Sequence, residues 1–128
     1  MKQRTHDRID PRLVGEVEEL GEGTSRVGLR CLPEMAADGS GLVHGGFTFG
    51  LADYAAMVAV NYPHVVLGGA EVRFLAPVRV GQRVVAEARV AEVKGKKHVV
   101  PVTVRADGVP VLEGTFTAFV LERHVLEG

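Results

Sequence analysis

The sequence predicts an α+β fold in which one antiparallel sheet of about six strands wraps around a single apolar helix. Valine, which is stiff at χ1 and favours strands, is the commonest residue, with 23 of 128 positions. Only the segment Gly45–Asn61 has the composition of a helix. Turn residues recur roughly every 10–14 positions after it, as an antiparallel meander requires. The length favours one domain, residues 1–128.

The N-terminal third predicts two strands. Residues 1–12 are polar, and we expect them to be loosely ordered. Val14–Leu20 gives a weak strand pattern that ends at the turn Gly21–Gly23. From Ser25 to Cys31, apolar and polar residues alternate, which indicates a strand with one buried face. A loop is expected over Pro33–Val43, because proline ends the strand.

The predicted helix Gly45–Asn61 is apolar on nearly every side, so we expect it to be buried all round. Asn61 and Pro63 supply its stop signal. Pro101 cannot donate to a sheet ladder and therefore indicates an edge or a bulge. Four strands are predicted after the helix: Ala70–Ala76, Arg83–Val93, Lys97–Arg105 and Val109–Leu121.

Charge and composition exclude several classes of function. The net charge is -1, and no basic stripe exists to hold a nucleic-acid backbone. One cysteine excludes a disulfide framework and a cysteine-rich zinc site. The N-terminus lacks the apolar core of a signal peptide, and no apolar run is long enough to span a bilayer. We expect a cytoplasmic protein without metal, membrane or nucleic-acid partners; the scattered histidines His6, His64, His98 and His124 lack metal-ligand spacing.

Asp53 is the one charged residue between Gly45 and Val60. Burial of an unpaired carboxylate is unfavourable and raises its pKa, so either a structural partner or a reaction must account for it. His44, Gly45 and Gly46 stand at the predicted helix start, where backbone N–H groups lack internal partners and carry partial positive charge. The two glycines would let a substrate carbonyl approach these donors, as in an oxyanion hole. His44 could orient that carbonyl or cap the helix.

The run Gly41–Ala55 resembles the hotdog-fold acyl-CoA thioesterases, and most closely the type found in phenylacetate degradation (PaaI-like). The shared pattern is His-Gly-Gly followed two helical turns later by Leu-Ala-Asp. Residues Arg73–Pro77 and Val80–Ala88 are similar to the family's third and fourth strands. The resemblance covers about residues 13–121 and implies a hotdog fold.

The resemblance also implies roles. Asp53 would be the catalytic carboxylate, which attacks the thioester or activates water. The N–H of Gly45 would polarise the thioester carbonyl, supported by Gly46 and His44. The family's site lies between two subunits, so a homodimer or a dimer of dimers is implied. No cofactor is implied, because coenzyme A is part of the substrate.

Two departures from the family pattern affect the expected site. Asp38 stands six residues before His44, where many members carry Asn; Asp can accept a hydrogen bond from His44 but has no amide N–H to donate. Some members place a serine or threonine hydroxyl near the water or nucleophile, early in the strand after the helix, and the stretch Leu67–Ala70 has none. Thr48 and Tyr54 are the candidates to supply such a hydroxyl here. The N-terminal helix common in the family is expected to be short or absent.

Basic residues are candidate contacts for the coenzyme A phosphates. Lys94, Lys96 and Lys97 form a basic turn, although such lysines more often belong to a solvated hairpin tip. Arg73 is a further candidate, and a surface ion pair with Glu71 is its alternative.

Three functions remain open from the sequence. Acyl-CoA hydrolysis is favoured by the motif. A non-catalytic acyl-CoA sensor usually carries a DNA-binding domain or lacks the carboxylate, whereas residues 1–12 are too short for such a domain and Asp53 is present. The hydratase or dehydratase branch of the fold typically uses a histidine on the helix, and Gly45–Val60 contains none.

Overall fold

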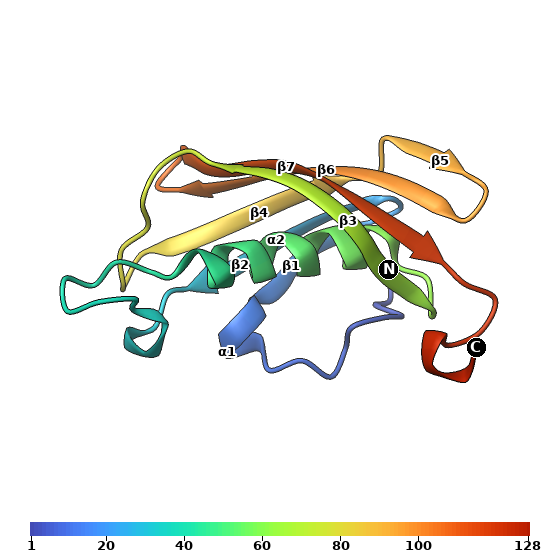
Figure 1. The fold of residues 1–128 in the computed structure, drawn as a ribbon, viewed down its shortest axis with the longest axis horizontal. Coiled ribbons are helices and arrows are strands. Elements are labelled where there is room, and N and C mark those ends of the chain that lie inside the picture. The colour runs from blue at the N-terminus through green and yellow to red at the C-terminus, as the bar shows by residue number, and fades with distance from the viewer.

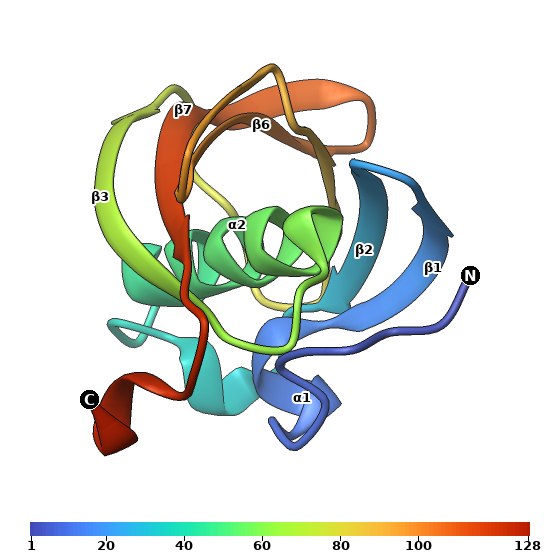
Figure 2. The ribbon, with the colours of Figure 1, turned by 90° about the vertical axis from the view of Figure 1, so that its right-hand side faces the viewer.

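The computed structural model describes residues 1–128 and contains a seven-stranded antiparallel sheet that curls around the long helix α2, Gly45–Val60 (Figures 1 and 2). The strand order is β1-β2-β4-β6-β7-β3, and β5 pairs with β6 alone. The strands are β1 Glu16–Gly21, β2 Thr24–Arg30, β3 Val65–Phe74, β4 Arg83–Arg89, β5 Glu92–Lys94, β6 Lys97–Ala106 and β7 Val109–Val120. The short helical turns are α1 Pro11–Val14, η1 Pro33–Met35 and η2 Val125–Glu127.

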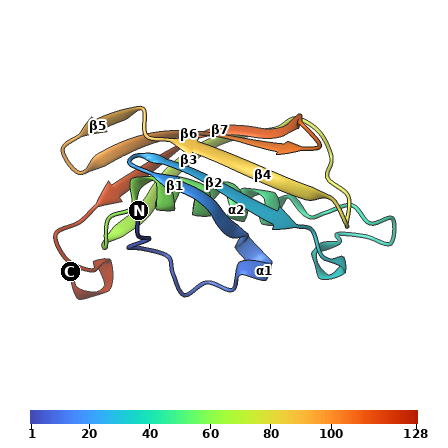
Figure 3. The ribbon, with the colours of Figure 1, turned by 180° about the vertical axis from the view of Figure 1, so that it is seen from behind.

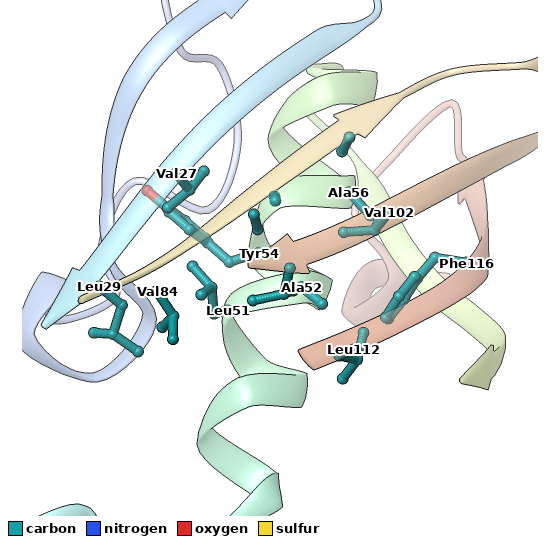
Figure 4. Close-up of a cluster of buried hydrophobic side chains, with 14 of the residues drawn as sticks. Val27, Leu29, Leu51, Ala52, Tyr54, Ala56, Val84, Val102, Leu112 and Phe116 are labelled. Atoms are coloured by element: carbon teal, nitrogen blue, oxygen red, sulfur yellow. The ribbon is translucent and has the colours of Figure 1, made fainter. Parts of the chain in front are cut away.

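Helix α2 ends one residue before the predicted boundary. Asn61 follows it in the left-handed conformation (φ 55°, ψ 44°), and its N–H donates to the Met57 carbonyl. Ten of the sixteen helical residues are buried, which confirms the prediction of a helix covered on most sides. Alanine at many of these positions lets the sheet approach closely. Figure 4 shows the side chains of α2 among those of β2, β4, β6 and β7.

Two predicted strands need correction. β3 begins at Val65 rather than Ala70, because Gly68 and Gly69 lie within the strand instead of forming a turn. A register shift between Leu67 and Gly69 marks a bulge at these glycines. The single strand predicted over Arg83–Val93 is divided into β4 and β5.

The division between β4 and β5 occurs opposite Pro101 of β6. The β4–β6 ladder ends with Ala88 opposite Val102, and the β5–β6 ladder resumes with Glu92 opposite Val99. The missing N–H of proline removes one ladder hydrogen bond at this point. The prediction of an edge or bulge at Pro101 is therefore confirmed. Figure 3 shows β5 extending beyond the end of β4.

The N-terminal segment, for which the sequence predicts loose order, is bound to the end of α2. The Asn61 side chain accepts from the Arg4 N–H (2.7 Å) and donates to the Lys2 carbonyl (2.9 Å). The Gln3 side-chain amide donates to the Tyr54 hydroxyl (3.0 Å). The expected short N-terminal helix is present as the single turn α1. No helix of the structure has the length and apolar character needed to cross a membrane.

Asn61 is expected to hold this segment in place. Asn61→Ala removes two largely buried hydrogen bonds and places alanine at positive φ, so it should lower the free energy of unfolding by about 2–3 kcal/mol. Asn61→Gly removes the same bonds but tolerates the conformation, and should lose about 1 kcal/mol less. Urea unfolding measures both, and hydrogen exchange should rise at residues 2–6. Unchanged exchange at those residues would contradict the role.

Candidate functional site

The glycine turn stands at the start of helix α2. His44 is the N-cap residue, but its side chain makes no capping hydrogen bond, so the capping role considered for it is not formed. Its backbone N–H donates to the Met35 carbonyl (2.9 Å), which ties the turn to η1. The exposed imidazole stands edge-on to Phe47, with ring centroids 6.3 Å apart. The N–H groups of Gly45 and Gly46 belong to the first helical turn and have no acceptor within the helix.

A side chain at either glycine would come close to an aromatic ring. A Cβ at Gly46 would lie 3.0 Å from the His44 ring, and one at Gly45 would lie 3.1 Å from the Phe74 ring. A pocket of about 380 Å³ opens beside Gly45. Its other lining residues are Leu42, Val43, Thr48, Phe74, Leu75, Ala76, Pro77, Val78 and Val111. The N-terminal end of α2 therefore borders a mostly apolar hollow in which Gly45 forms part of the wall.

Of the two hydroxyl candidates, only Thr48 lies at this pocket. Thr48 is buried one helical turn after Gly45, and its hydroxyl makes no hydrogen bond within the chain. The Tyr54 hydroxyl instead accepts from Gln3 of the N-terminal segment. Thr48 is thus the free hydroxyl nearest in sequence to the glycine turn.

Asp53 has no partner within the chain. Its Oδ1 is shielded from solvent and accepts no hydrogen bond. Desolvation by burial raises the pKa of Asp53 from 3.8 to about 6. A carboxylate that only stabilised this fold would be paired with a donor or a cation. A structural partner for Asp53 could be a neighbouring backbone N–H or a donor from another subunit. No backbone N–H of this chain donates to it, so a donor from another subunit is the structural explanation that remains.

Asp53 and Gly45 of one chain are too far apart to act on one carbonyl group. Eight residues of α-helix separate them, which corresponds to about 12 Å along the helix axis. An oxyanion donor and a nucleophile or base must each lie about 3 Å from the reacting atoms. Asp53 is also absent from the pocket beside Gly45. The two groups that the resemblance assigns to one site therefore lie apart within one chain.

Asp38 does not contact His44. Its Oδ1 accepts from the backbone N–H of Ser40 (2.9 Å) and, more weakly, from that of Leu42 (3.4 Å). It therefore stabilises an exposed turn before the glycine turn, as aspartate commonly does. The acceptor role that was considered for Asp38 toward His44 is not formed, because the carboxylate is engaged by its own loop.

The lysine candidates lie away from Gly45. Lys94, Lys96 and Lys97 are exposed on the β5–β6 hairpin, near the C-terminal end of α2, whereas Gly45 is at the opposite end (Figure 1). Arg73 is exposed on β3 opposite Glu113, and the alternative ion pair with Glu71 is not formed. The structure thus brings none of the three lysines to the glycine turn within one chain, whereas Arg73 directly precedes Phe74, whose ring lies against Gly45.

Sequence reasoning missed the contact between Phe74 and Gly45. Phe74 is 56% exposed at the end of β3, yet its ring lies against the first residue of α2. The segment Arg73–Pro77 carried a family resemblance but no local signal for this contact, because the two residues are 29 positions apart.

A family model described as the thioesterase superfamily matches residues 40–113, which is more than half of the chain. The chain belongs to the thioesterase superfamily. The matched region includes the glycine turn, all of α2 and strand β3. The hotdog fold and the PaaI-like resemblance are both confirmed, since PaaI proteins are among the structural neighbours of this superfamily member.

Solved structures reproduce the fold closely. An uncharacterized protein, PH1136, from Pyrococcus horikoshii is 55% identical, with 98% of this chain and 97% of that chain covered and a TM-score of 0.97. A mutant of the phenylacetic acid degradation protein PaaI from Thermus thermophilus is 29% identical over 85% of this chain and 95% of that one, with a TM-score of 0.79. A hypothetical thioesterase from Streptococcus pneumoniae, crystallised with coenzyme A, shares the fold at 20% identity and a TM-score of 0.77, with 85% and 87% covered.

The curated relatives are longer proteins. A methylthioribose-1-phosphate isomerase from Aquifex aeolicus is 48% identical over 123 residues, which is 95% of this chain and 27% of that protein. The transcription factor FapR from Caldanaerobacter subterraneus subsp. tengcongensis is 28% identical over 93% of this chain and 60% of that protein. The chain therefore spans about a quarter of the length of the isomerase and about three fifths of the length of FapR. The names of both relatives describe the whole proteins.

The raised pKa of Asp53 predicts a pH-dependent stability. Because the folded protein disfavours the charged form, ionisation of Asp53 destabilises the fold as pH rises from about 4 to above 6. Asp53→Asn should therefore increase the free energy of unfolding at pH 8, by at most ~3 kcal/mol. The gain should shrink as pH falls through 6 and vanish below about 4. Urea unfolding at pH 4, 6 and 8 measures it; an equal gain at all three values would exclude the ionised carboxylate as the cause.

Proposed function

We propose that the protein hydrolyses acyl-CoA thioesters to a free acid and coenzyme A. The observation that carries this proposal is Asp53, a half-buried carboxylate on an otherwise apolar helix, whose Oδ1 is shielded from solvent and has no hydrogen-bond partner. The open N–H groups of the glycine turn and membership of the thioesterase superfamily support it. Strained or unsatisfied groups of this kind persist mainly where a reaction uses them.

The chemistry assigns one step to each half of the site. The thioester carbonyl oxygen accepts from the Gly45 N–H, and the partial positive charge of the helix start stabilises the oxyanion. The Asp53 carboxylate, ionised above a pH of about 6, takes a proton from the attacking water or itself attacks the carbonyl carbon. In the first case the C–S bond breaks as the tetrahedral intermediate collapses, and protonated Asp53 returns its proton to the thiolate. In the second case the C–S bond breaks as Asp53 attacks, so coenzyme A leaves as the thiolate and a mixed anhydride with Asp53 remains. Water then hydrolyses this anhydride to the free acid and the Asp53 carboxylate, and the proton released neutralises the thiolate.

We infer that each site combines Asp53 of one chain with Gly45 of a second copy. The roughly 12 Å between the two residues within one chain requires a second chain. Strand β3 offers the contact surface, because it is an edge strand of ten residues with exposed Gly68, Gly69 and Ala70 and without proline. Unpaired edges of this kind readily pair with another strand. The other edge, β1, carries three glutamates within six residues, and their like charges disfavour pairing with a second copy.

Steady-state hydrolysis tests the role of Asp53. With a panel of aliphatic and aryl acyl-CoA substrates, Asp53→Asn and Asp53→Ala should each lose roughly two or more orders of magnitude in kcat/KM. Wild-type activity should decline as pH falls below about 6, since the carboxylate must be ionised. Release of free thiol is the readout. Full activity in both variants, or an inert wild type toward every thioester, would refute the proposal.

Mixing of two inactive variants tests the shared site. Chains with Asp53→Asn are co-assembled with chains that carry Gly45→Val, whose larger side chain obstructs the glycine turn. If sites are shared, one of the two sites in each mixed dimer is intact, and random assembly should restore about a quarter of wild-type activity. If each chain forms its own site, mixing restores nothing. Circular dichroism of each variant alone serves as the folding control.

A second function, non-catalytic binding of acyl-CoA, is favoured by the similarity to FapR over 60% of that transcription factor. The unpartnered carboxylate disfavours it, because ligand binding alone gives no reason to retain a buried charge. Binding of a thioester that remains intact after prolonged incubation would select this function.

A further inference from the structure

A second pocket, of about 340 Å³, lies at the C-terminal end of α2, at the opposite end of the helix from the glycine turn. It is enclosed by the N-terminal segment, by the start of β3 and by the C-terminal residues. Its charged and titratable lining residues are Arg4, His6, Asp7, Arg8, His64 and His124. We propose that this pocket binds a phosphate group, and that the phosphate belongs to the nucleotide end of coenzyme A. The second part rests on the proposed function.

The composition of the pocket favours an anion. Two arginines and three of the five histidines line it together with a single acidic residue, Asp7, although the whole chain has a net charge of -1. The Arg4 guanidinium lies over the ring of Tyr62, 5.2 Å from its centroid, so Arg8 is the arginine of the pocket that has no partner within the chain. Guanidinium and imidazole N–H groups are effective phosphate donors. The histidines do not converge as ligands, because no group of three His, Cys, Asp or Glu residues in the chain is placed to hold a metal ion. An anionic ligand is therefore the better match than a cation.

Hydrogen bonds fix the walls of the pocket before any ligand binds. Asn61 holds the backbone on both sides of Gln3, and Thr5 is buried with its hydroxyl 2.8 Å from Nδ1 of His6. His6 itself has a left-handed backbone (φ 56°), a conformation that is uncommon for residues other than glycine but that histidine adopts more often than most. On the other side, the Leu121 N–H donates to the His64 carbonyl (2.8 Å).

One imidazole in the pocket has a nitrogen without a partner. Nδ1 of His64 is buried and makes no hydrogen bond, and its ring stands edge-on to His124 with centroids 6.1 Å apart. Burial lowers the pKa of His6, and the charge of Asp7 acts in the opposite direction. A bound phosphate would place a negative charge beside these rings and would raise the pKa of His6.

The position of the pocket fits the shape of coenzyme A. Asn61 lies eight residues after Asp53, or about 12 Å further along the helix axis, and His64 follows it. Coenzyme A carries its phosphates at the far end of the pantetheine arm from the thiol, so a phosphate site must lie well away from Asp53. Lys94, Lys96 and Lys97 lie at the same end of the molecule, but on an exposed hairpin.

Calorimetric titration with coenzyme A, pantetheine and inorganic pyrophosphate tests the proposal. The double variant Arg8→Gln/His124→Gln changes two exposed side chains of the pocket, and Arg89→Gln on the outer face of the sheet is the matched control. We expect the double variant to bind coenzyme A at least about tenfold more weakly, the effect of losing one or more charge-assisted hydrogen bonds. Pantetheine affinity should be unchanged, and the control should match the wild type. Equal thermal unfolding of all three proteins confirms that they are folded.

Each alternative outcome has a distinct meaning. Unchanged coenzyme A affinity in the double variant overturns the proposal, as does weakening only in Lys94→Gln/Lys96→Gln/Lys97→Gln. If pyrophosphate binds in the pocket but coenzyme A does not compete with it, the assignment to coenzyme A is overturned and a free phosphate compound is the ligand. Thioester hydrolysis with an unchanged KM in the double variant overturns this inference alone. A wild type that binds coenzyme A through the pocket but hydrolyses nothing refutes the thioesterase proposal alone.

Discussion

Helix α2 contributes nine residues to the hydrophobic core, and the sheet curls around it so that the inward side chains of β2, β4, β6 and β7 all pack on it. Burial of this apolar surface is the main favourable term in folding, since each large side chain contributes roughly 1.5–3 kcal/mol. The same burial also has an unfavourable effect on one side chain of the helix. It leaves the Asp53 carboxylate half-buried, with its Oδ1 shielded from solvent and without a donor, and this desolvation raises the pKa of Asp53 to about 6. The packing that stabilises the fold therefore also sets the pKa of the carboxylate to which the proposed function assigns the chemistry.

The three features that the proposals use lie at different points along α2. At its start, two glycines leave backbone N–H groups beside an apolar pocket. Asp53 lies about two turns further along the helix, and the basic pocket lies at the C-terminal end of the helix. The straightness of an α-helix keeps these three places apart, so one chain cannot bring Asp53 to its own Gly45. In the proposed dimer, two chains associate through the exposed edge β3, which would bring Asp53 of one chain to Gly45 of the other. The basic pocket would then lie far enough from Asp53 for an extended ligand to reach both.

Errors in the sequence-based predictions arose where local signals were ambiguous. Gly68 and Gly69 have the composition of a turn, but within β3 they form a bulge, because hydrogen bonds to β7 override the weak intrinsic preference of glycine. Pro101 correctly predicted an irregularity in the sheet. The break itself occurs in the neighbouring segment, where β4 ends and β5 begins opposite Pro101. The polar N-terminal residues carry no periodic pattern, and their placement comes from the side chain of Asn61, which sequence alone marked only as a helix stop.

The sequence by itself determined the single apolar helix, most of the strands, the isolation of Asp53 and the glycine turn, because all of these depend on periodicity or spacing within a short window. The tertiary structure alone decided which groups meet. It placed Phe74 against Gly45, engaged Asp38 in its own turn rather than with His44, set the three lysines at the opposite end from Gly45, and assembled a basic pocket from both termini and the start of β3. The reason is physical: contacts between distant segments depend on strand order and register across the whole sheet, and no local pattern of residues encodes them.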